Sequence, residues 1–308
     1  MTGPLLTQPR RALDASQSDD RGAAWLTAMH RGNWAAAWAV NDAVLATRDP
    51  ATRDDAGRPY HERWVWDGRP LTGRVLVRCY HGLGDTLQFW RYIAPLAAKA
   101  DVAVEVQPAL VSLLSGTVPL LPFDPAHPAP PRHDVEIMEL AHALRLPPSP
   151  VPYLQAGAMP LNLPRPILGV CWAAWGLDAT RSVPWPLLTP LGQMGSVVSL
   201  QRGVAGGAWP DPLDGCMDVI ATARLVMACD HVVTIDTMVA HLAGALGRPV
   251  SVLLKAGADW RWMRGRDDSP WYASARLYRQ PVPGDWTTPV ARLLDDIAVG
   301  TPPNAQGW

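Results

Sequence analysis

The chain has 308 residues, of which 48% are hydrophobic, so it is long and apolar enough for two domains of ordinary size. Its 27 Lys plus Arg nearly balance its 28 Asp plus Glu, which excludes the strongly basic surface of a nucleic-acid-binding protein. The four cysteines share no C-x-x-C spacing and fit buried free thiols in a reducing compartment. We find no signal peptide, and prolines interrupt the longest uncharged run, 182–201, so we expect a cytoplasmic protein.

The first 70 residues are predicted to lie outside the main body of the fold. Residues 1–20 are expected to form a flexible tail, and 21–70 a helical appendage followed by a connector. Apolar residues recur at helical spacing over 23–46, and Gly32-Asn33 divides this segment into two short helices. The pair is similar to one tetratricopeptide-type repeat. A single copy cannot bury its own apolar face, so we expect it to pack against the rest of the chain.

A first α/β block is predicted over residues 71–160. Its expected elements are a strand at 74–80, a glycine turn and a helix that continues to about 99, a strand at 102–106, a short helix at 108–114, a Pro-rich crossing at 119–131, a strand at 133–138 and a helix at 139–146. Residues 147–166 contain seven prolines and no long periodic run, which is typical of an interdomain segment.

A second α/β block is predicted over residues 161–308. Its expected elements are a strand at 167–172, a short helix at 185–193, a strand at 196–200, a helix at 217–228, a strand at 231–235, a helix at 238–246, strands at 251–254 and 275–279, and a helix at 290–298. Strands that alternate with helices in two blocks indicate two doubly wound, parallel-sheet domains that face a cleft.

The strand–turn–helix unit at 231–246 is the first candidate for a ligand site. Asp236 and Thr237 occupy the predicted N-cap of the helix, where their oxygens can accept its first amide hydrogens. In an open α/β sheet, ligands bind at the carboxyl ends of the strands, and the start of a helix favours an anion such as phosphate. An ordinary βαβ unit with a capping Asp is an equal alternative.

Four further features are candidates, each with a structural alternative. The Gly82-x-Gly84 turn lets the backbone approach a ligand closely, although it fits a bare tight turn equally well. Asp85 is a carboxylate beside the expected cleft, but the helix dipole alone also favours a carboxylate there. Arg181 lies on a loop where a cation can hold a diphosphate, and a solvated arginine fits as well. His241 fits a packed histidine better than a catalytic one.

Six segments together resemble glycosyltransferase family 9, which includes the ADP-heptose:lipopolysaccharide heptosyltransferases, and more closely its members found behind tetratricopeptide repeats. These segments are 81–89 (HGLGDTLQF), 172–184, 199–201 (SLQ), 236–245 (DTMVAHLAGA), 259–262 (DWRW) and 267–272 (DDSPWY). The resemblance covers roughly residues 60–290. It implies a GT-B fold of two Rossmann-like domains with a small N-terminal helical appendage. It also implies an inverting, metal-independent transfer from a nucleotide-diphosphate sugar to an envelope glycan, lipid or protein.

The resemblance also implies roles for individual residues. Asp85 matches the carboxylate proposed as general base in the family. The resemblance assigns donor binding to Arg181, Ser182, Gln201, Asp236, Thr237, Met238 and His241. It assigns a place on the acceptor side, or in the loop there, to His81, Gly82, Gly84 and Gln88. The resemblance implies no metal and no cofactor beyond the nucleotide sugar as co-substrate. Residues 71–160 would then be the acceptor domain and 161–308 the donor domain.

Two departures from the family pattern keep an alternative open. Met238 stands where the heptosyltransferases have glycine, so heptose specificity does not follow. The first domain is short and the helical pair is single, which favours a non-catalytic GT-B-fold binding or scaffold protein that uses its helical appendage. The expected partners are a nucleotide sugar and its acceptor but no nucleic acid, and peripheral association with a membrane is left open.

Overall fold

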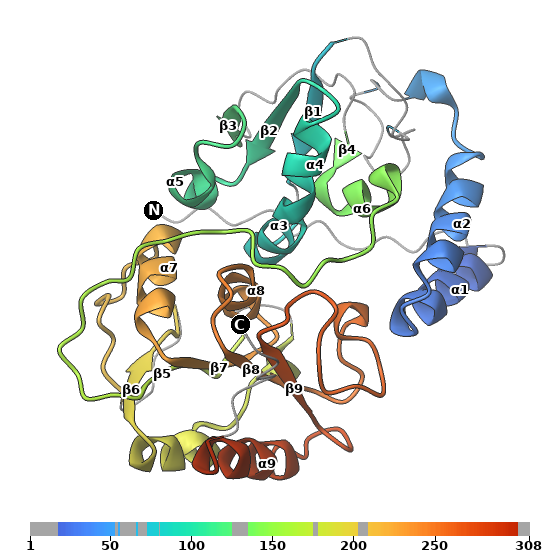
Figure 1. The fold of residues 1–308 in the computed structure, drawn as a ribbon. Helices are drawn as coiled ribbons and strands as arrows, with labels where there is room; N and C mark the ends of the chain where they lie inside the picture. Colours follow the sequence, from blue (N-terminus) through green and yellow to red (C-terminus); the bar gives the residue numbers. More distant parts are fainter. Residues whose placement is uncertain are drawn as a thin grey trace.

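The computed structural model describes residues 18–52, 55, 66, 73–79, 81–124, 135–174, 178–202 and 209–300. It contains two parallel sheets, one in each half of the chain, and a pair of helices at one side (Figure 1). Most of the predicted tail and connector lies outside the described residues. Among those that are described, no helix is both long and apolar enough to cross a bilayer.

The first sheet has four strands in the order β3-β2-β1-β4, and all neighbouring pairs are parallel. Its elements are β1 (Val75–Arg78), α3 (Leu83–Phe89), α4 (Ile93–Ala97), β2 (Val102–Val106), α5 (Val111–Leu114), β3 (Leu120–Pro122), β4 (Val135–Glu136) and α6 (Leu140–Leu144). Every residue of β1 and β2 is buried, as expected of parallel strands covered on both faces.

Three predictions for this block were wrong. The single helix to residue 99 is interrupted after Phe89 by a 3-10 turn, because Pro95 lacks an amide hydrogen and its ring clashes with a carbonyl one turn earlier. The predicted crossing at 119–131 contains the edge strand β3, where the missing donor of Pro122 is tolerated. The strand expected at 133–138 ends at Glu136, whose carboxylate accepts from the Met138 amide and starts a 3-10 turn.

The second sheet has five parallel strands in the order β6-β5-β7-β8-β9. Its elements are β5 (Ile167–Cys171), β6 (Ser196–Ser199), α7 (Val219–Ala228), β7 (His231–Ile235), α8 (Met238–Ala245), β8 (Val250–Leu254), β9 (Ala275–Arg279) and α9 (Thr287–Ala298). All five predicted strands are present within one residue of their expected ends. The helix expected at 185–193 is a 3-10 helix, because Pro186 and Pro190 do not fit an α-helix interior.

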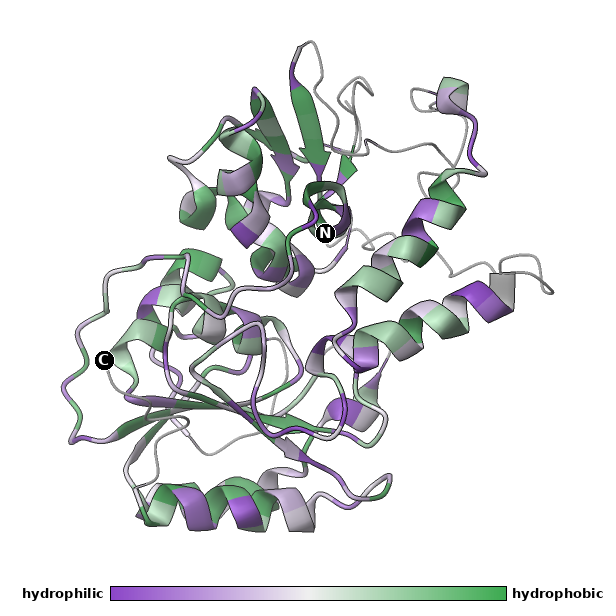
Figure 2. Cartoon of the chain, turned by 45° about the vertical axis from the view of Figure 1, so that its right-hand side comes forward, coloured by the Kyte–Doolittle hydropathy of each residue, from purple (hydrophilic) through white to green (hydrophobic). Residues whose placement is uncertain are grey.

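Helices cover both faces of the second sheet. Figure 1 shows α7 and α8 on the face toward the first domain and α9 on the opposite face. Figure 2 shows mainly hydrophobic colouring along the strands and mixed colouring along α9. Val290 and Leu293 of α9 are buried, whereas Arg292 and Asp295 are exposed. This amphipathic pattern is typical of a helix that packs one face on a sheet.

The N-terminal appendage consists of α1 (Ser18–His30) and α2 (Trp34–Leu45). Gly32 takes a positive φ of 67° in the turn between them, and the Asn33 side chain caps α2 by accepting from the Ala36 amide at 3.1 Å. The predicted division at Gly32-Asn33 is therefore confirmed.

The helical pair packs on both halves of the chain. Trp25 lies edge-on to Trp260 with ring centroids 5.2 Å apart, and Trp34 meets Trp271 in the same way at 5.8 Å. On the other side, the Asp42 carboxylate binds the His142 ring at 2.8 Å and the Arg145 guanidinium at 2.5 Å. The appendage is thus packed against the main body, as expected of a unit that cannot bury its own apolar face.

The interdomain segment 147–166, all of which is described, contains no helix or strand. It is hydrogen-bonded to both α3 and α8. The amides of Tyr153 and Leu154 donate to the Ala245 carbonyl at 3.0 and 3.1 Å, and the Tyr153 hydroxyl donates to the Leu87 carbonyl at 2.7 Å. The segment thereby ties the two blocks together across the face where their helices meet.

Candidate active site

Helices α3 and α8 follow β1 and β7 at the carboxyl edges of their sheets, and their first turns touch. The contact is made at Gly84, where an added Cβ would lie 2.9 Å from Cδ2 of His241 and 3.4 Å from Cα of Met238. Only a residue without a side chain permits this approach. The glycine turn therefore brings two predicted donor-side residues against the predicted acceptor-side loop, and α8 occupies the space beside Gly84.

Asp85 lies in the first turn of α3, at this junction. One carboxylate oxygen accepts from the Gly82 amide at 3.0 Å, and the other accepts from Nη2 of Arg261 at 2.5 Å. The side chain is about a quarter exposed, at 25%. Asp85 is thus held in a fixed orientation by two donors while part of its carboxylate stays open to solvent.

Arg261 belongs to the second half of the chain and is the centre of a buried polar network. Its side chain is 10% exposed and donates to Asp85, to Asp259 at 2.9 Å and to the Gln88 amide oxygen at 2.7 Å. Its guanidinium also lies over the Trp260 ring, 4.6 Å from the centroid. Burial acts to lower the pKa of Arg261, but the carboxylates of Asp85 and Asp259 outweigh burial and raise it, so Arg261 stays charged.

Sequence reasoning assigned no role to Arg261. Its side chain meets Asp85, which lies 176 positions earlier in the chain, and no local pattern predicts such a pairing. The available signal was the segment 259–262, which contributed to the family resemblance but gave no partner for the arginine.

The other predicted acceptor-side residues divide into two groups. Gly82, Gly84 and Gln88 gather around Asp85 and Arg261. Gln88 is fully buried, and within the described chain its amide nitrogen has no hydrogen-bond partner. Its oxygen orients Arg261, so Gln88 is part of the support for Asp85. His81 instead lies on the exposed side of the turn and lines a cavity beneath the appendage.

The start of α8 differs from the predicted capped helix. Thr237 is the N-cap residue, but its hydroxyl lies near Thr234 Oγ1 at 3.4 Å and the Ile235 carbonyl at 3.5 Å. Across the described residues, neither Thr237 nor Asp236 offers a side-chain oxygen to the first amides of α8. The predicted side-chain capping was therefore wrong. Thr237 therefore leaves the first amides of α8 without a side-chain cap of its own.

Two cations lie beside this helix start. Arg181 donates to the backbone carbonyl of Asp236 at 2.8 Å, and its Nε lies 3.8 Å from Asp178. Asp178 also accepts from Lys255 at 2.7 Å, and this hydrogen bond is the main reason why the pKa of Asp178 is lowered. Lys255 directly follows β8, so it stands at the same sheet edge, although sequence reasoning gave it no role. Burial raises the pKa of Asp236.

Ser182 and Gln201 shape the loop that follows β5. The Ser182 hydroxyl accepts from the Ala174 amide at 3.0 Å. The Gln201 side chain accepts from the amides of Ala173 and Trp172 at 2.8 and 3.1 Å and donates to the Ala173 carbonyl at 3.0 Å. Both side chains are engaged with backbone here, and their donor-binding roles stay predictions.

His241 is a packed side chain. It is 5% exposed, Nδ1 lies 3.0 Å from the Tyr272 hydroxyl, and the ring stacks on Trp262 with centroids 5.5 Å apart. Burial, with help from the charges of Arg261 and Arg91, lowers the pKa of His241 to about 3. The ring is therefore neutral at pH 7, which agrees with the packed histidine favoured by the sequence.

The site therefore places a carboxylate, Asp85, beside a helix start that can bind an anion. Arg181 and Lys255 add positive charge at the same edge. In the part of the chain that the structure describes, no group of three or more His, Cys, Asp or Glu side chains is placed to hold a metal ion. Such an arrangement can accept a proton at one point and stabilise a negative charge at another.

No known protein-family profile matches this sequence. Protein FlbA of Caulobacter vibrioides is 29% identical over 149 residues, which cover 42% of this chain and 24% of FlbA. The chain thus matches about a quarter of the length of that relative.

Two solved structures are similar over most of the chain. Escherichia coli ADP-heptose lps heptosyltransferase II gives a TM-score of 0.53 at 16% identity and covers 74% of this chain and 98% of its own. The glycosyl transferase family 9 protein of Veillonella parvula DSM 2008 has a TM-score of 0.52 at 10% sequence identity. The match covers 76% of this chain and 91% of the Veillonella chain. These likenesses confirm the predicted fold class, two parallel-sheet α/β domains of the GT-B type, to which this chain adds an N-terminal helical pair.

Proposed function

We propose that this protein is an inverting glycosyltransferase that moves a sugar from a nucleotide-diphosphate donor without a metal ion. The observation that carries the proposal is the position of Asp85 against the uncapped start of α8. The GT-B fold supports it, since the two structural neighbours are named as a heptosyltransferase and a glycosyl transferase family 9 protein. The acceptor would be an envelope glycan, lipid or protein reached from the cytoplasm.

The donor diphosphate would lie at the start of α8. The first amides of α8 would bind it, and Arg181 and Lys255 would add positive charge. Asp85 would take the proton of the acceptor hydroxyl as that oxygen attacks the anomeric carbon. The bond to the diphosphate breaks on the opposite face of the sugar, so the configuration inverts, and the amides and cations stabilise the leaving nucleoside diphosphate.

The test is donor hydrolysis. A panel of nucleotide sugars is incubated with the protein, with and without EDTA, and the released nucleoside diphosphate is measured. We expect turnover of one donor that EDTA does not change, and a loss of about 10²- to 10⁴-fold in Asp85→Asn. The matched control is Asp101→Asn, an exposed aspartate that pairs with Arg74 at the amino end of β2. Equal rates in Asp85→Asn and wild type would contradict the assigned base.

A non-catalytic binding or scaffold protein is the second candidate. The observation that favours it is that both oxygens of Asp85 already accept hydrogen bonds, from Gly82 and from Arg261. A scaffold would bind a nucleoside diphosphate, seen as a thermal shift, with no turnover of any donor. A transferase would show both.

A further inference from the structure

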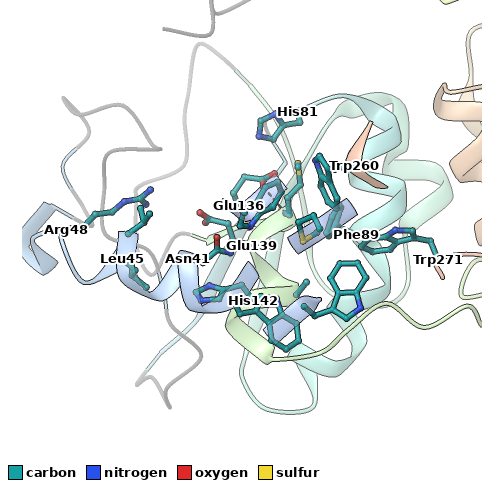
Figure 3. A pocket seen from close by; sticks show the side chains of 17 residues that line it. Asn41, Leu45, Arg48, His81, Phe89, Glu136, Glu139, His142, Trp260 and Trp271 are labelled. Atoms are coloured by element: carbon teal, nitrogen blue, oxygen red, sulfur yellow. Dashed lines mark hydrogen bonds between the residues drawn. The ribbon is translucent and has the colours of Figure 1, made fainter. Parts of the chain in front are cut away.

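A cavity of ≈ 320 Å³ lies between the helical pair and the carboxyl edge of the first sheet (Figure 3). Three parts of the chain line it: the facing sides of α1 and α2, the residues that follow β1 and β4, and the loop at 260–271. Its aromatic lining consists of Trp25, Trp34, Trp38, Phe89, Trp260 and Trp271.

The aromatic rings are fixed by contacts between different elements. The pairs Trp25–Trp260 and Trp34–Trp271 meet at 75° and 84°, so the rings do not stack flat on one another. Part of each indole surface therefore lines the cavity. Trp38 on α2 also lines it and is half-buried. Rigid, flat indole surfaces suit a ligand with flat apolar faces of its own.

Polar groups converge on the same space. Figure 3 shows Glu136 and Glu139 in the middle of the lining, with Trp260 and Phe89 on one side of them. Asn41 adds an amide from α2. A mostly apolar wall with a few convergent polar groups is typical of a small-molecule site, and the volume lies at the lower end of the usual range of about 300–1,000 Å³.

The burial of Glu136 disfavours its charged form, which favours a neutral ligand with hydroxyl groups over a cation. Burial raises the pKa of Glu136 well above its ordinary value, and the charge of Glu139 adds to the effect. A carboxyl group accepts hydrogen bonds and, when it carries a proton, also donates one, as a sugar hydroxyl does. The Trp260 ring already carries the Arg261 guanidinium, which further disfavours a second cation at that wall.

The cavity shares a wall with the network that holds Asp85. Met138 and Trp260 both line it. Both also contact Arg261, through the Met138 sulfur at 3.7 Å and the Trp260 ring at 4.6 Å. Arg261 in turn binds Asp85. A ligand in the cavity would therefore lie close to the carboxylate proposed as general base.

We infer that this cavity binds a sugar residue of the acceptor, whose apolar faces pack on the indole rings while its hydroxyls bond to Glu136, Glu139 and Asn41. The acceptor role rests on the proposed glycosyltransferase function. Sugar binding itself does not depend on it, and a volume of ≈ 320 Å³ suits one or two sugar rings. The helical pair would thus complete a carbohydrate site that the first sheet leaves open.

The test uses the full chain without any donor. Saturation-transfer NMR is recorded with methyl glycosides of hexoses, N-acetylhexosamines and heptoses, and with a Lys-rich peptide as a second probe. We expect transfer to at least one glycoside and at least tenfold weaker binding in Trp38→Ala, with partial recovery in Trp38→Phe. Leu26→Ala is the matched control, because Leu26 is an exposed α1 residue that does not line this cavity.

Three outcomes overturn the inference: no glycoside binds, a glycoside binds equally well to Trp38→Ala, or the peptide binds here in place of the sugars. Thermal shift with nucleoside diphosphates is measured on the same variants. If nucleotide binding and donor hydrolysis persist while sugar binding is absent, the inference fails and the proposed function stands. Sugar binding that depends on Trp38, with no donor turnover, would instead keep the carbohydrate site and reject the transferase.

Discussion

The two sides of the α3–α8 junction are built in different ways. On the second sheet, the start of α8 follows β7 directly, so local chain order places Asp236, Thr237 and Met238 at the sheet edge. On the first sheet, the orientation of Asp85 depends on Arg261, and the neighbouring cavity takes walls from α1 and α2. One side is assembled locally and the other through contacts distant in sequence. Substitutions distant in sequence from the α3–α8 junction should therefore disturb the geometry around Asp85 more than the geometry at the start of α8.

Removal of Arg261 should have the largest effect on stability. Arg261→Met leaves Asp85, Asp259 and Gln88 without their shared donor inside a buried network. Breaking a buried pair costs about 3–5 kcal/mol, and since Asp85 and Asp259 are partly exposed we expect about 3 kcal/mol. Urea denaturation measures the loss.

The control for that comparison is an exposed arginine with a similar partner. Arg266 binds Asp268 at 2.6 Å, but both side chains are substantially exposed, so Arg266→Met should cost less than about 1 kcal/mol. Equal losses in the two variants would mean that the Arg261 network does not stabilise the junction.

The glycine turn provides a matched pair for the contact between the two helices. Gly84→Ala places a methyl group 2.9 Å from His241 and 3.4 Å from the Met238 backbone, so α3 and α8 must separate, at a cost of about 1–3 kcal/mol. In Gly82→Ala the nearest atom is Oδ2 of Asp85 at 3.4 Å, and we expect a loss of no more than about 1 kcal/mol. Thermal unfolding measures the stability of both variants. If Gly82→Ala lost as much stability as Gly84→Ala, the close approach of α3 and α8 at Gly84 would be contradicted.

The cations at the second sheet edge should affect binding more than folding. We expect Arg181→Met and Lys255→Met each to weaken the affinity for a nucleoside diphosphate by about tenfold, the size of one charge-assisted contact. Calorimetric titration measures the change. Lys99→Met, at an exposed position after α4, controls for the loss of a lysine. If Lys99→Met weakened binding as much as Lys255→Met, the site at the sheet edge would be ruled out.

The same contrast explains which features the sequence predicted. Buried parallel strands such as β2 and β7 have the predicted ends, because a short apolar run between turns depends little on distant residues. The sequence also placed Asp85 and the start of α8 at sheet edges, where strand–turn–helix order puts them. The break before Pro95 was missed although its cause is local, since the apolar periodicity continues through it.

The missed site residues have a different cause. Arg261 and Lys255 act through Asp85 and Asp178, which lie in other parts of the chain, so their partners become known only when the fold is known. The capping predicted for Thr237 failed because its hydroxyl is turned toward Thr234 and β7. Side-chain direction at a helix start depends on such neighbours and is not determined by residue type.

The last prediction concerns the pH dependence that His241 adds to stability. Its pKa of about 3 in the folded protein lies below the ordinary value of 6.5, so the unfolded chain binds the proton more tightly. The contribution of His241 to stability is therefore fully present above pH 6.5 and is lost as the pH falls from 6.5 toward 3. Over one pH unit in this window, the loss is at most about 1.4 kcal/mol.

Urea denaturation of wild type and His241→Leu from pH 7.5 to 5 isolates this effect. Leucine removes the titrating group, so the stability of the variant should fall less steeply with acid, whatever the constant cost of losing the Tyr272 hydrogen bond. His231, whose pKa burial lowers to about 4, is present in both proteins and cancels in the difference. Parallel curves would mean that His241 is protonated as easily in the folded chain as in the unfolded one. The contact of α8 with α3 would then be open to water, and the comparison between the two sides of the junction would have to be revised.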